Sequence, residues 1–229
     1  MQEHAKVVVI GGGVVGCSIL FHLAKMGWKD VVLLERNELT SGSSWHAAGS
    51  FHTLSSDPNV SKLQDYTISL YKEIEETSGH SISMHKTGGY YLASNQSWHD
   101  YLKRERSKAR SIGLDQEFVS IDEVIEKHPL INPEHYVAAL WDPTDGDLDP
   151  SGVVYAYAKS ARVHGAEFFT HTPVLETNQR ADGSWDVVTE KGNIHAEYIV
   201  NAGGLWAREV GRMANVHLPV VPMEHHYLI

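Results

Sequence analysis

The sequence predicts a mixed α/β fold, and three observations predict it. A short β-branched run near the N-terminus meets a cluster of glycines, and a helical pattern and a second β-branched run follow. Further strand and helix patterns alternate along the rest of the chain, which is typical of layered α/β proteins. The 229 residues are enough for one large domain or two small ones.

The first pattern is a strand–helix–strand unit. Residues 6–10 are apolar and β-branched, as expected of a buried parallel strand. Residues 14–25 predict a helix, and Gly27 supplies its expected stop. Residues 31–34 predict a second buried strand, which ends at Glu35. We expect the usual right-handed crossover between these two strands.

The middle of the chain combines a long loop with helices and strands. The segment 40–55 is rich in Ser, Gly and Ala and is long for a simple connection, which is typical of functional loops. Ser120 and Glu123 form a capping box, which predicts a short helix that stops before Pro129. The other patterns predict helices over 60–78 and 98–111 and strands over 89–93 and 136–141.

The last third of the chain predicts short strands between two helices. The helices are expected over 151–163 and 205–213, and the strands over 166–170, 174–177, 185–189 and 194–201. An apolar strand pattern over 219–229 continues to the last residue without a turn or a polar tail. We therefore expect the chain to be truncated at its C-terminal end.

The composition argues against several classes of function. The formal net charge of −10 argues against a nucleic-acid partner, which would need clustered Lys and Arg against the phosphates. The most apolar stretch, 7–21, is too short to span a membrane and has no basic segment before it, as a signal peptide would. Cys17 is the single cysteine, so no intramolecular disulfide can form. We expect a bacterial cytoplasmic protein, or a processed protein of the mitochondrial matrix.

Gly11, Gly13 and Gly16 form the pattern G-x-G-x-x-G between the first strand and the first helix. In such a motif the glycines allow a tight turn, a close approach of the backbone to a pyrophosphate, and close helix–strand packing. Glu35 stands 19 residues after Gly16, where a carboxylate can accept hydrogen bonds from ribose hydroxyls. This order predicts a Rossmann-like dinucleotide-binding domain. The alternative is a purely structural glycine turn.

Two features favour FAD over NAD as the dinucleotide. The long loop after the second strand could run along a cofactor that lies extended across the domain. The sequence N-A-G-G at 201–204 stands between a strand and a helix, which predicts a second close approach of the backbone to the same dinucleotide. The alternatives are an ordinary strand–turn–helix joint for N-A-G-G and a noncovalent NAD-binding module for the domain.

Asp145, Asp147 and Asp149 have the spacing that opens a calcium-binding EF-hand loop. That loop fails at its sixth position, which is Pro150 rather than Gly, and at its twelfth, which is Ala156 rather than Glu. The fifteen histidines are scattered and form no zinc-binding spacing. We therefore expect no metal site.

Five segments of the sequence resemble a known family. They are V-V-V-I-G-G-G-V-V-G at 7–16, L-L-E-R-N-E-L-T-S-G-S-S-W-H-A-A-G at 33–49, D-P-T-D-G-D-L-D-P at 142–150, N-A-G-G-L-W-A-R-E-V-G at 201–211 and P-M-E-H-H-Y at 222–227. They are similar to the FAD domain of the dimethylglycine and sarcosine dehydrogenases, which belong to the D-amino-acid-oxidase-like superfamily. The resemblance covers essentially the whole chain, and W-H-A-A-G is its most specific piece.

The resemblance implies roles for individual residues. His46 matches the histidine that carries FAD covalently, through a ring nitrogen bonded to the flavin 8α-methyl group. His225 matches an active-site histidine close to the flavin. Together with the two glycine motifs, the other implied cofactor contacts are Gly11, Gly13, Val14, Val15, Gly16, Glu35, Arg36, Gly42, Ser43, Ser44, Trp45, Ala47, Ala48, Gly49, Ser50, Val174, Ala202, Gly203 and Trp206.

The residues around His46 are compatible with that role. A neutral imidazole is a nucleophile, and small neighbours at 47–49 would let the backbone lie against a flat ring system. The alternative for His46 is a packed core histidine. For His225 the alternative is a strand histidine beside the sheet.

The architecture implied by the family is a Rossmann-like FAD-binding domain interleaved with part of a β-rich substrate domain. Residues 1–80 and 145–215 would form the FAD domain, and residues 81–144 and 216–229 part of the substrate domain. The implied reaction is oxidative N-demethylation of a small N-methylated glycine, dimethylglycine or sarcosine, by hydride transfer to the flavin. Oxygen or an electron-transfer flavoprotein would accept the electrons. Tetrahydrofolate would bind only in a C-terminal domain that this sequence lacks.

Two other functions are compatible with the same sequence. One is another amine or imino-acid oxidase of the superfamily. The other is a non-catalytic regulatory subunit, because the regulatory subunit of pyruvate dehydrogenase phosphatase resembles the same pair of domains. An intact W-H-A-A-G favours the enzyme.

Overall fold

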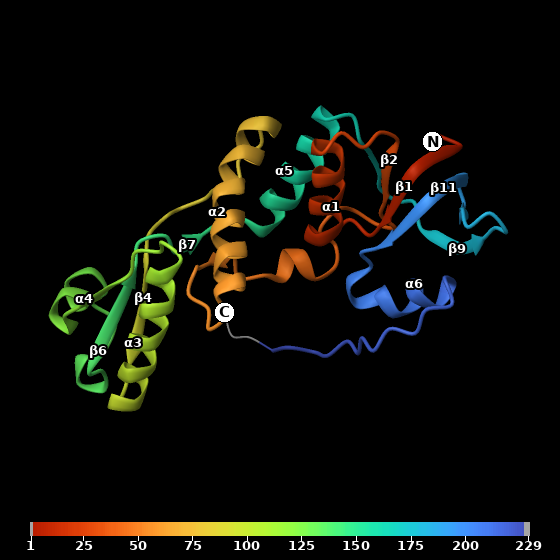
Figure 1. Ribbon diagram of the computed structural model, residues 1–229. Coiled ribbons are helices and arrows are strands. Elements are labelled where there is room, and N and C mark those ends of the chain that lie inside the picture. The colour runs from red at the N-terminus through yellow and green to blue at the C-terminus, as the bar shows by residue number, and fades with distance from the viewer. Residues whose placement is uncertain (1, 227–229) are drawn as a thin grey trace. The chain divides into compact units, whose positions relative to one another are not determined.

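The computed structural model describes residues 2–226, which form two compact units (Figure 1). Unit 1 comprises the chain up to Ala48, the segment Ile74–Ile82 and the chain from Pro150 onward, and unit 2 comprises Gly49–Glu73 and Ser83–Asp149. The division into an FAD domain and a partial substrate domain stays a prediction, because compactness alone does not identify what a unit binds.

Unit 1 is built on a six-stranded sheet with the order β8-β2-β1-β11-β10-β9. The strands are β1 (His4–Ile10), β2 (Val31–Leu34), β8 (Glu167–Phe169), β9 (Val174–Gln179), β10 (Trp185–Thr189) and β11 (Gly192–Asn201). β1 runs parallel to β2 and β11, and β2 runs parallel to β8. β10 pairs antiparallel with both β11 and β9. The predicted mixed α/β fold with a parallel sheet is confirmed.

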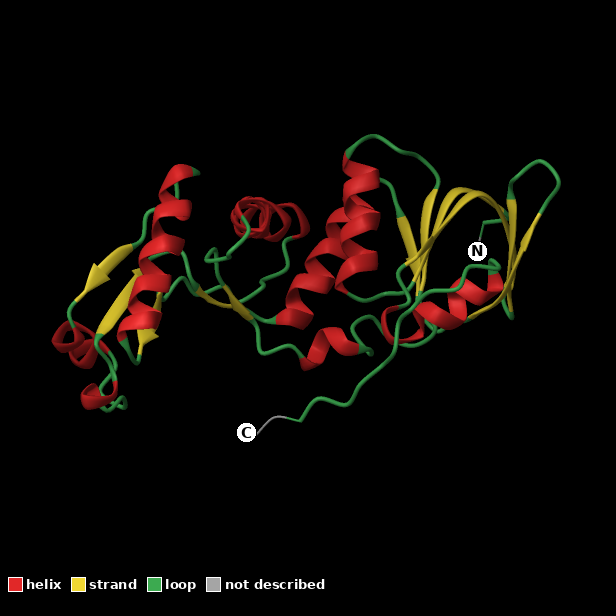
Figure 2. Ribbon diagram, turned by 60° about the horizontal axis from the view of Figure 1, so that its bottom comes forward, coloured by secondary structure: helices red, strands yellow, loops and turns green. Residues whose placement is uncertain are grey.

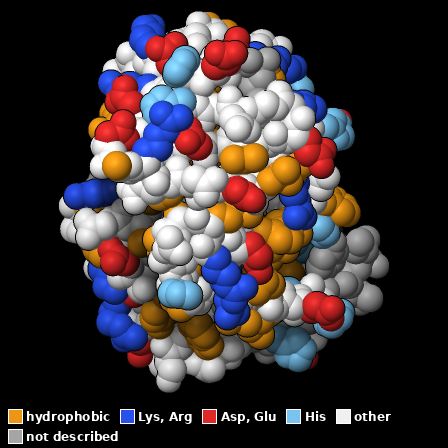
Figure 3. All heavy atoms as spheres, turned by 90° about the vertical axis from the view of Figure 1, so that its right-hand side faces the viewer, with side chains coloured by type: hydrophobic (Ala, Val, Ile, Leu, Met, Phe, Trp, Pro, Cys, Tyr) orange, Lys and Arg blue, Asp and Glu red, His pale blue; other side chains and the backbone are white. Residues whose placement is uncertain are grey.

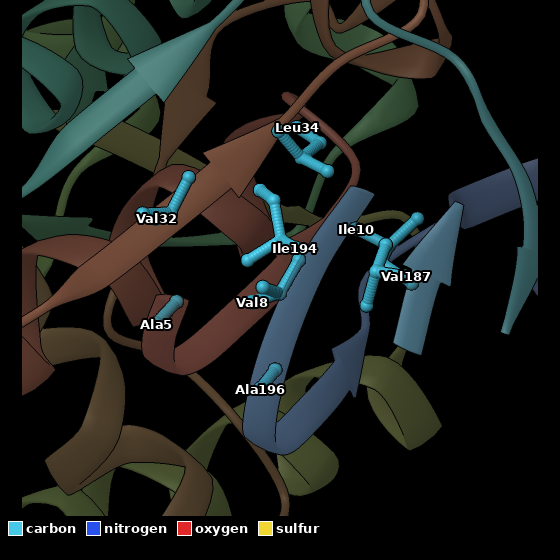
Figure 4. Close-up of a cluster of buried hydrophobic side chains, with 8 residues drawn as sticks. All are labelled: Ala5, Val8, Ile10, Val32, Leu34, Val187, Ile194 and Ala196. Carbon is cyan, nitrogen blue, oxygen red and sulfur yellow. The ribbon is translucent and has the colours of Figure 1, made fainter. Parts of the chain in front are cut away.

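The helices of unit 1 are α1 (Val14–Lys25), α5 (Pro150–Val163) and α6 (Ala207–Met213), with 3-10 turns η1 (Ser43–His46) and η3 (Gly204–Trp206). α1 and α5 pack against each other, while α6 packs on β9 and β11. Figure 4 shows eight buried side chains that four strands contribute to one cluster, against which Val210 of α6 also packs. This apolar core fixes the positions of β1, β2 and β11, and therefore of the loops that follow their carboxyl ends.

Unit 2 contains two small antiparallel sheets. In the larger one, β6 (Ala138–Asp142) lies between β4 (Gly89–Ala93) and β5 (Glu117–Val119), and in the smaller one β3 (Ser50–Phe51) pairs with β7 (Gly146–Asp147). The helices are α3 (Gln96–Ser111), α4 (Ile121–Lys127) and most of α2 (Pro58–Ser78), with a 3-10 turn η2 (Pro133–His135), as Figure 2 shows. The predicted cap of α4 is confirmed, because the Ser120 side chain accepts a hydrogen bond from the Glu123 amide at 3.2 Å.

Unit 2 also has a buried polar network. The Oδ2 atom of Asp142 accepts hydrogen bonds from the Thr53 hydroxyl at 2.7 Å and from Gln116 Nε2 at 2.6 Å. The Tyr91 hydroxyl donates to Asp145 Oδ2 at 2.8 Å. Burial, and then the nearby Asp142 carboxylate, raise the pKa of Asp145 to about 6. This aspartate is therefore part of the interior of unit 2.

The strand predicted over 219–229 is wrong where it can be compared. Residues 216–226 have no regular secondary structure, and residues 227–229 lie outside the described residues. Pro219 and Pro222 have no backbone N–H, so an apolar pattern containing them cannot complete a strand ladder.

The surface carries side chains of mixed type (Figure 3). On the face shown in Figure 3, acidic, basic and histidine side chains are interspersed with hydrophobic ones, without a continuous basic stripe among the described residues. Within residues 2–226, no helix is both long enough and apolar enough to cross a membrane.

Candidate functional site

The loops that follow β1, β2 and β11 line a cavity of about 560 Å³ in unit 1, together with residues 173–174 and α6. This volume is in the range of sites that hold small organic ligands. The predicted contacts that line it are Gly11, Gly13, Val14, Val15, Glu35, Arg36, Gly42, Ser43, Ser44, Val174, Ala202, Gly203 and Trp206. The fold thus brings together, around one cavity, segments that are far apart in the sequence.

The two glycine motifs pack directly on each other. Gly11 has a φ of +119°, which L-residues rarely adopt, and a Cβ there would overlap the carbonyl oxygen of Ala202. A Cβ on Gly16 would overlap the carbonyl oxygen of Gly11. Gly16 does not line the cavity, and its lack of a side chain lets α1 approach the loop. Gly11 and Gly13 line the cavity, so no side chain stands between the backbone and a ligand at these two positions.

The loop after β2 is hydrogen-bonded to the glycine loop. The Val14 amide, at the start of α1, donates to Ser44 Oγ at 2.9 Å, and the Thr40 amide donates to the Gly12 carbonyl at 3.1 Å. Gly13 is the N-cap of α1, and a Cβ there would lie 3.1 Å from Ser44 Oγ. The N-terminus of a helix carries partial positive charge and free N–H groups, which favour phosphate.

Glu35 supports the glycine loop from the end of β2. Glu35 is 9% exposed, and its carboxylate accepts hydrogen bonds from the Gly12 amide at 2.7 Å and the Asn37 amide at 2.8 Å. Each carboxylate oxygen keeps a second lone pair with which a ribose hydroxyl could bond. Burial, and then the Glu35 carboxylate, raise the pKa of the Cys17 thiol to about 12.

One wall of the cavity is apolar and aromatic. The Arg36 guanidinium stacks on the Trp206 ring, with 3.6 Å between its central carbon and the ring centroid. The other lining residues were not singled out as contacts from the sequence. They are Ile10, Gly12, Leu34, Ser41, Pro173, Asn201, Gly204, Leu205, Ala207, Glu209, Val210 and Met213. The helical spacing of Trp206, Val210 and Met213 is the signal that could have found the apolar ones.

His46 is exposed, so its interpretation as a packed core histidine is wrong. It ends the turn η1, where its Nδ1 lies 3.1 Å from the carbonyl oxygen of Gly42. The Trp45 ring lies beside it, with 3.8 Å between the two ring centroids. A carbonyl oxygen can only accept, so Nδ1 is the donor, and in the neutral form of the ring the lone pair then lies on Nε2. A nucleophilic nitrogen is therefore available on an exposed ring.

Several predicted residues are not among the described lining of the cavity. They are Gly16, Trp45, His46, Ala47, Ala48, Gly49, Ser50 and His225. Gly49 and Ser50 belong to unit 2, where Ser50 pairs with Asp147. His225 is exposed in the segment without regular secondary structure. Among the described residues, no group of three or more His, Cys, Asp or Glu side chains is placed to hold a metal ion.

The sequence of the chain is similar to proteins of a known family. A family model described as FAD dependent oxidoreductase (DAO) matches residues 6–229. Over the whole chain, the sequence is 39% identical to mitochondrial dimethylglycine dehydrogenase of Rattus norvegicus, 38% to mitochondrial sarcosine dehydrogenase of Homo sapiens and 35% to the mitochondrial pyruvate dehydrogenase phosphatase regulatory subunit of Mus musculus. The chain covers 27%, 26% and 26% of these proteins, so it spans about a quarter of their length.

Solved structures agree with the sequence relatives. The crystal structure of L-proline dehydrogenase from P. horikoshii superposes with a TM-score of 0.86 at 29% identity, over 94% of this chain and 57% of that one. The match covers nearly the whole of this chain.

Proposed function

The chain belongs to the family of FAD-dependent oxidoreductases, and from that premise we propose that FAD is the dinucleotide of the unit 1 cavity. The observation that carries the proposal is the glycine loop, because side chains at Gly11 or Gly16 would overlap backbone atoms. The glycine loop and Val15 at the start of α1 would hold the pyrophosphate, Glu35 with Arg36 the adenosine ribose, and Val174 the adenine.

The proposed reaction is the oxidative N-demethylation of a small N-methylated glycine. When bound, FAD supplies a hydride acceptor for the N-methyl carbon. The support is the identity of 39% and 38% to proteins named dimethylglycine dehydrogenase and sarcosine dehydrogenase. The names do not decide between one and two N-methyl groups, and both substrates belong to the proposal.

We further propose that FAD is attached covalently through Nε2 of His46. The support is that His46 is exposed, that its Nδ1 proton is held by Gly42, and that Nε2 keeps its lone pair. Trp45 beside the imidazole limits its rotation. His225 as an active-site histidine rests on the family resemblance alone.

The attachment can be tested by denaturing the FAD-loaded chain in acid and measuring flavin fluorescence that stays with the polypeptide. The proposal expects attached flavin in the wild type and none in His46→Ala. His52→Ala is the matched control, because His52 is another exposed histidine a few residues along the chain. Attached flavin in His46→Ala would place the link elsewhere, and its absence from the wild type would refute the covalent link.

The substrate can be tested with the longest natural form of the protein. Sarcosine, dimethylglycine, proline and glycine are added separately under anaerobic conditions, and bleaching of the flavin absorbance is followed. We expect bleaching by sarcosine or dimethylglycine. Bleaching by proline or glycine alone indicates another oxidase of the family. No bleaching by any amine favours a non-catalytic subunit, for which the 35% identity to a regulatory subunit is the support.

Further parts of the proposal concern the whole protein. Oxygen or an electron-transfer flavoprotein would accept the electrons, and tetrahydrofolate would bind in a further domain. We propose a mitochondrial matrix location, which the similarity to two mitochondrial enzymes supports, with a bacterial cytoplasmic location as the alternative. Reduction of an added electron-transfer flavoprotein by the substrate-reduced protein would distinguish the two acceptors.

A further inference from the structure

Ser44 makes a hydrogen bond that the predicted cofactor contacts do not account for. Its hydroxyl oxygen accepts from the Val14 amide at 2.9 Å, across 30 residues of sequence. The side chain is half-buried, whereas its neighbour Ser43 is exposed. Gly13 has no side chain in the space that faces this hydroxyl, and a Cβ there would lie 3.1 Å from it. The middle glycine of the motif thus leaves room for Ser44 as well as for a ligand.

Ser44 and His46 belong to the same short turn. In η1, the Ala47 amide donates to the Ser44 carbonyl at 3.4 Å, and His46 Nδ1 donates to the Gly42 carbonyl at 3.1 Å. At the N-terminal end of η1, the N-cap residue Gly42 makes no side-chain hydrogen bond. The Ser44 hydroxyl therefore joins a turn with few internal bonds to the first N–H of α1, and both η1 and α1 pack on α5.

We propose that Ser44 is a positioning residue that fixes the η1 turn on α1 and so holds His46 in the orientation in which Nε2 reacts with the flavin. This inference rests on the proposed covalent link. It differs from the role implied by the family, in which Ser44 contacts the cofactor directly. Displacing the turn by about 1 Å would slow the reaction on the order of a hundredfold. One hydrogen bond that fixes the turn is therefore enough to change the rate of attachment.

The attachment of His46 to the flavin reduces the flavin by two electrons, and dioxygen is the oxidant that restores it. A bond forms between His46 Nε2 and the 8α carbon while one C–H bond of the methyl group breaks. The methyl proton and the Nδ1 proton pass to the flavin with two electrons, and dioxygen then takes both electrons and both protons as hydrogen peroxide. Ser44 takes no part in these transfers.

The test compares Ser44→Ala, Ser44→Thr and, as a control, Ser184→Ala in the full chain, since Ser184 is half-buried in the same unit and does not line the cavity. The rate of covalent attachment is measured at saturating FAD, and the Kd of noncovalent FAD is measured in a His46→Ala background. Hydrogen exchange at the Val14 amide is measured without FAD. For Ser44→Ala we expect attachment roughly tenfold slower, a Kd within about threefold of its parent, and faster exchange at Val14. Ser44→Thr keeps the hydroxyl and restores the rate, and Ser184→Ala behaves as wild type.

Several outcomes overturn the inference, and they are distinguishable. Attachment at the wild-type rate in Ser44→Ala, or rapid exchange of Val14 in the wild type, shows that the hydroxyl does not position the turn. A parallel loss of affinity and attachment shows that Ser44 is a direct ligand of FAD. A wild type that binds FAD but attaches none refutes the proposed covalent link, and this inference with it.

Discussion

The Oε2 atom of Glu35 accepts a hydrogen bond from the amide of Gly12 at 2.7 Å, which joins the end of β2 to the middle of the glycine loop. The other carboxylate oxygen accepts from the Asn37 amide. The residue that sequence reasoning assigns to the ribose therefore also holds the loop that faces the pyrophosphate. A change at Glu35 should affect both the stability of unit 1 and its affinity for FAD.

Glu35→Gln can keep only one of the two hydrogen bonds, because a side-chain amide has one acceptor oxygen while its nitrogen can only donate. One backbone N–H is left without its partner, so we expect a loss of about 1–3 kcal/mol in unfolding free energy and weaker FAD binding. Urea unfolding and FAD titration measure the two effects. Glu38→Gln is the control, because Glu38 is exposed and pairs only with exposed His171 in the described contacts. That change should stay within about 0.5 kcal/mol of wild type. Equal stability of both variants would contradict the assigned role of Glu35.

Gly16→Ala tests the contact between the glycine loop and α1. The added Cβ would overlap the carbonyl oxygen of Gly11, so backbone must move. We expect a loss of about 1–3 kcal/mol or more, together with loss of FAD binding. Met26→Ala is the control, because Met26 is exposed at the other end of α1 and does not line the cavity. This variant should keep stability and FAD affinity close to wild type. FAD binding by Gly16→Ala with unchanged affinity would refute the close-packing argument.

Local patterns predicted the elements that position the site. The helix over 14–25 and the strand over 31–34 match α1 and β2 because their apolar periodicity, glycines and stop signals are all local. The strand–turn–helix reading of N-A-G-G also holds, with the refinement that its first turn is the 3-10 helix η3. Thirteen of the predicted contacts line one cavity because the two glycine motifs follow adjacent parallel strands, β1 and β11.

Nonlocal contacts escaped sequence reasoning. β3 is only two residues long, and it forms because Ser50 and Phe51 pair with β7. No local sequence pattern predicts such a pairing. The bond between Ser44 and Val14 likewise depends on the path of a whole loop. The exposure of His46 could not be read from its apolar neighbours either, since alanine and tryptophan occur both in cores and on surfaces.

Cys17 should be chemically inert in the folded chain. It is fully buried under the glycine loop, and its pKa of about 12 leaves almost no thiolate at pH 8. We expect a disulfide reagent to label it at least about a thousandfold more slowly than in the same chain unfolded in urea, by the ratio of thiolate fractions. Absorbance of the released thiol gives the rate. Fast labelling of the folded chain would show that α1 opens readily or that the thiol is accessible.

Asp145 should make unit 2 less stable as pH rises through about 6. Its pKa is raised in the folded state, first by burial and then by Asp142, from the ordinary aspartate value of 3.8 that applies to the unfolded chain. A raised carboxyl pKa means that the folded state binds the proton more tightly. The resulting stabilisation is complete below about pH 4 and is lost between about pH 4 and 6. Asp145→Asn does not titrate and keeps an acceptor for the Tyr91 hydroxyl. Relative to this variant, the wild type should therefore lose up to about 3 kcal/mol between pH 4 and 7.

Hydrogen exchange of the amides in β4 and β6 measures this difference, because these strands carry Tyr91 and Asp142 and report the opening of unit 2. Comparing wild type with Asp145→Asn at each pH cancels the titration of the carboxylates that do not interact with Asp145. Asp115→Asn is the matched control, since Asp115 is an exposed carboxylate of the same unit, and its difference from wild type should not change with pH. A pH-independent difference between wild type and Asp145→Asn would mean that Asp145 is already ionised inside the network. In that case the Tyr91 hydroxyl, rather than a proton on the carboxyl group, would compensate for its burial.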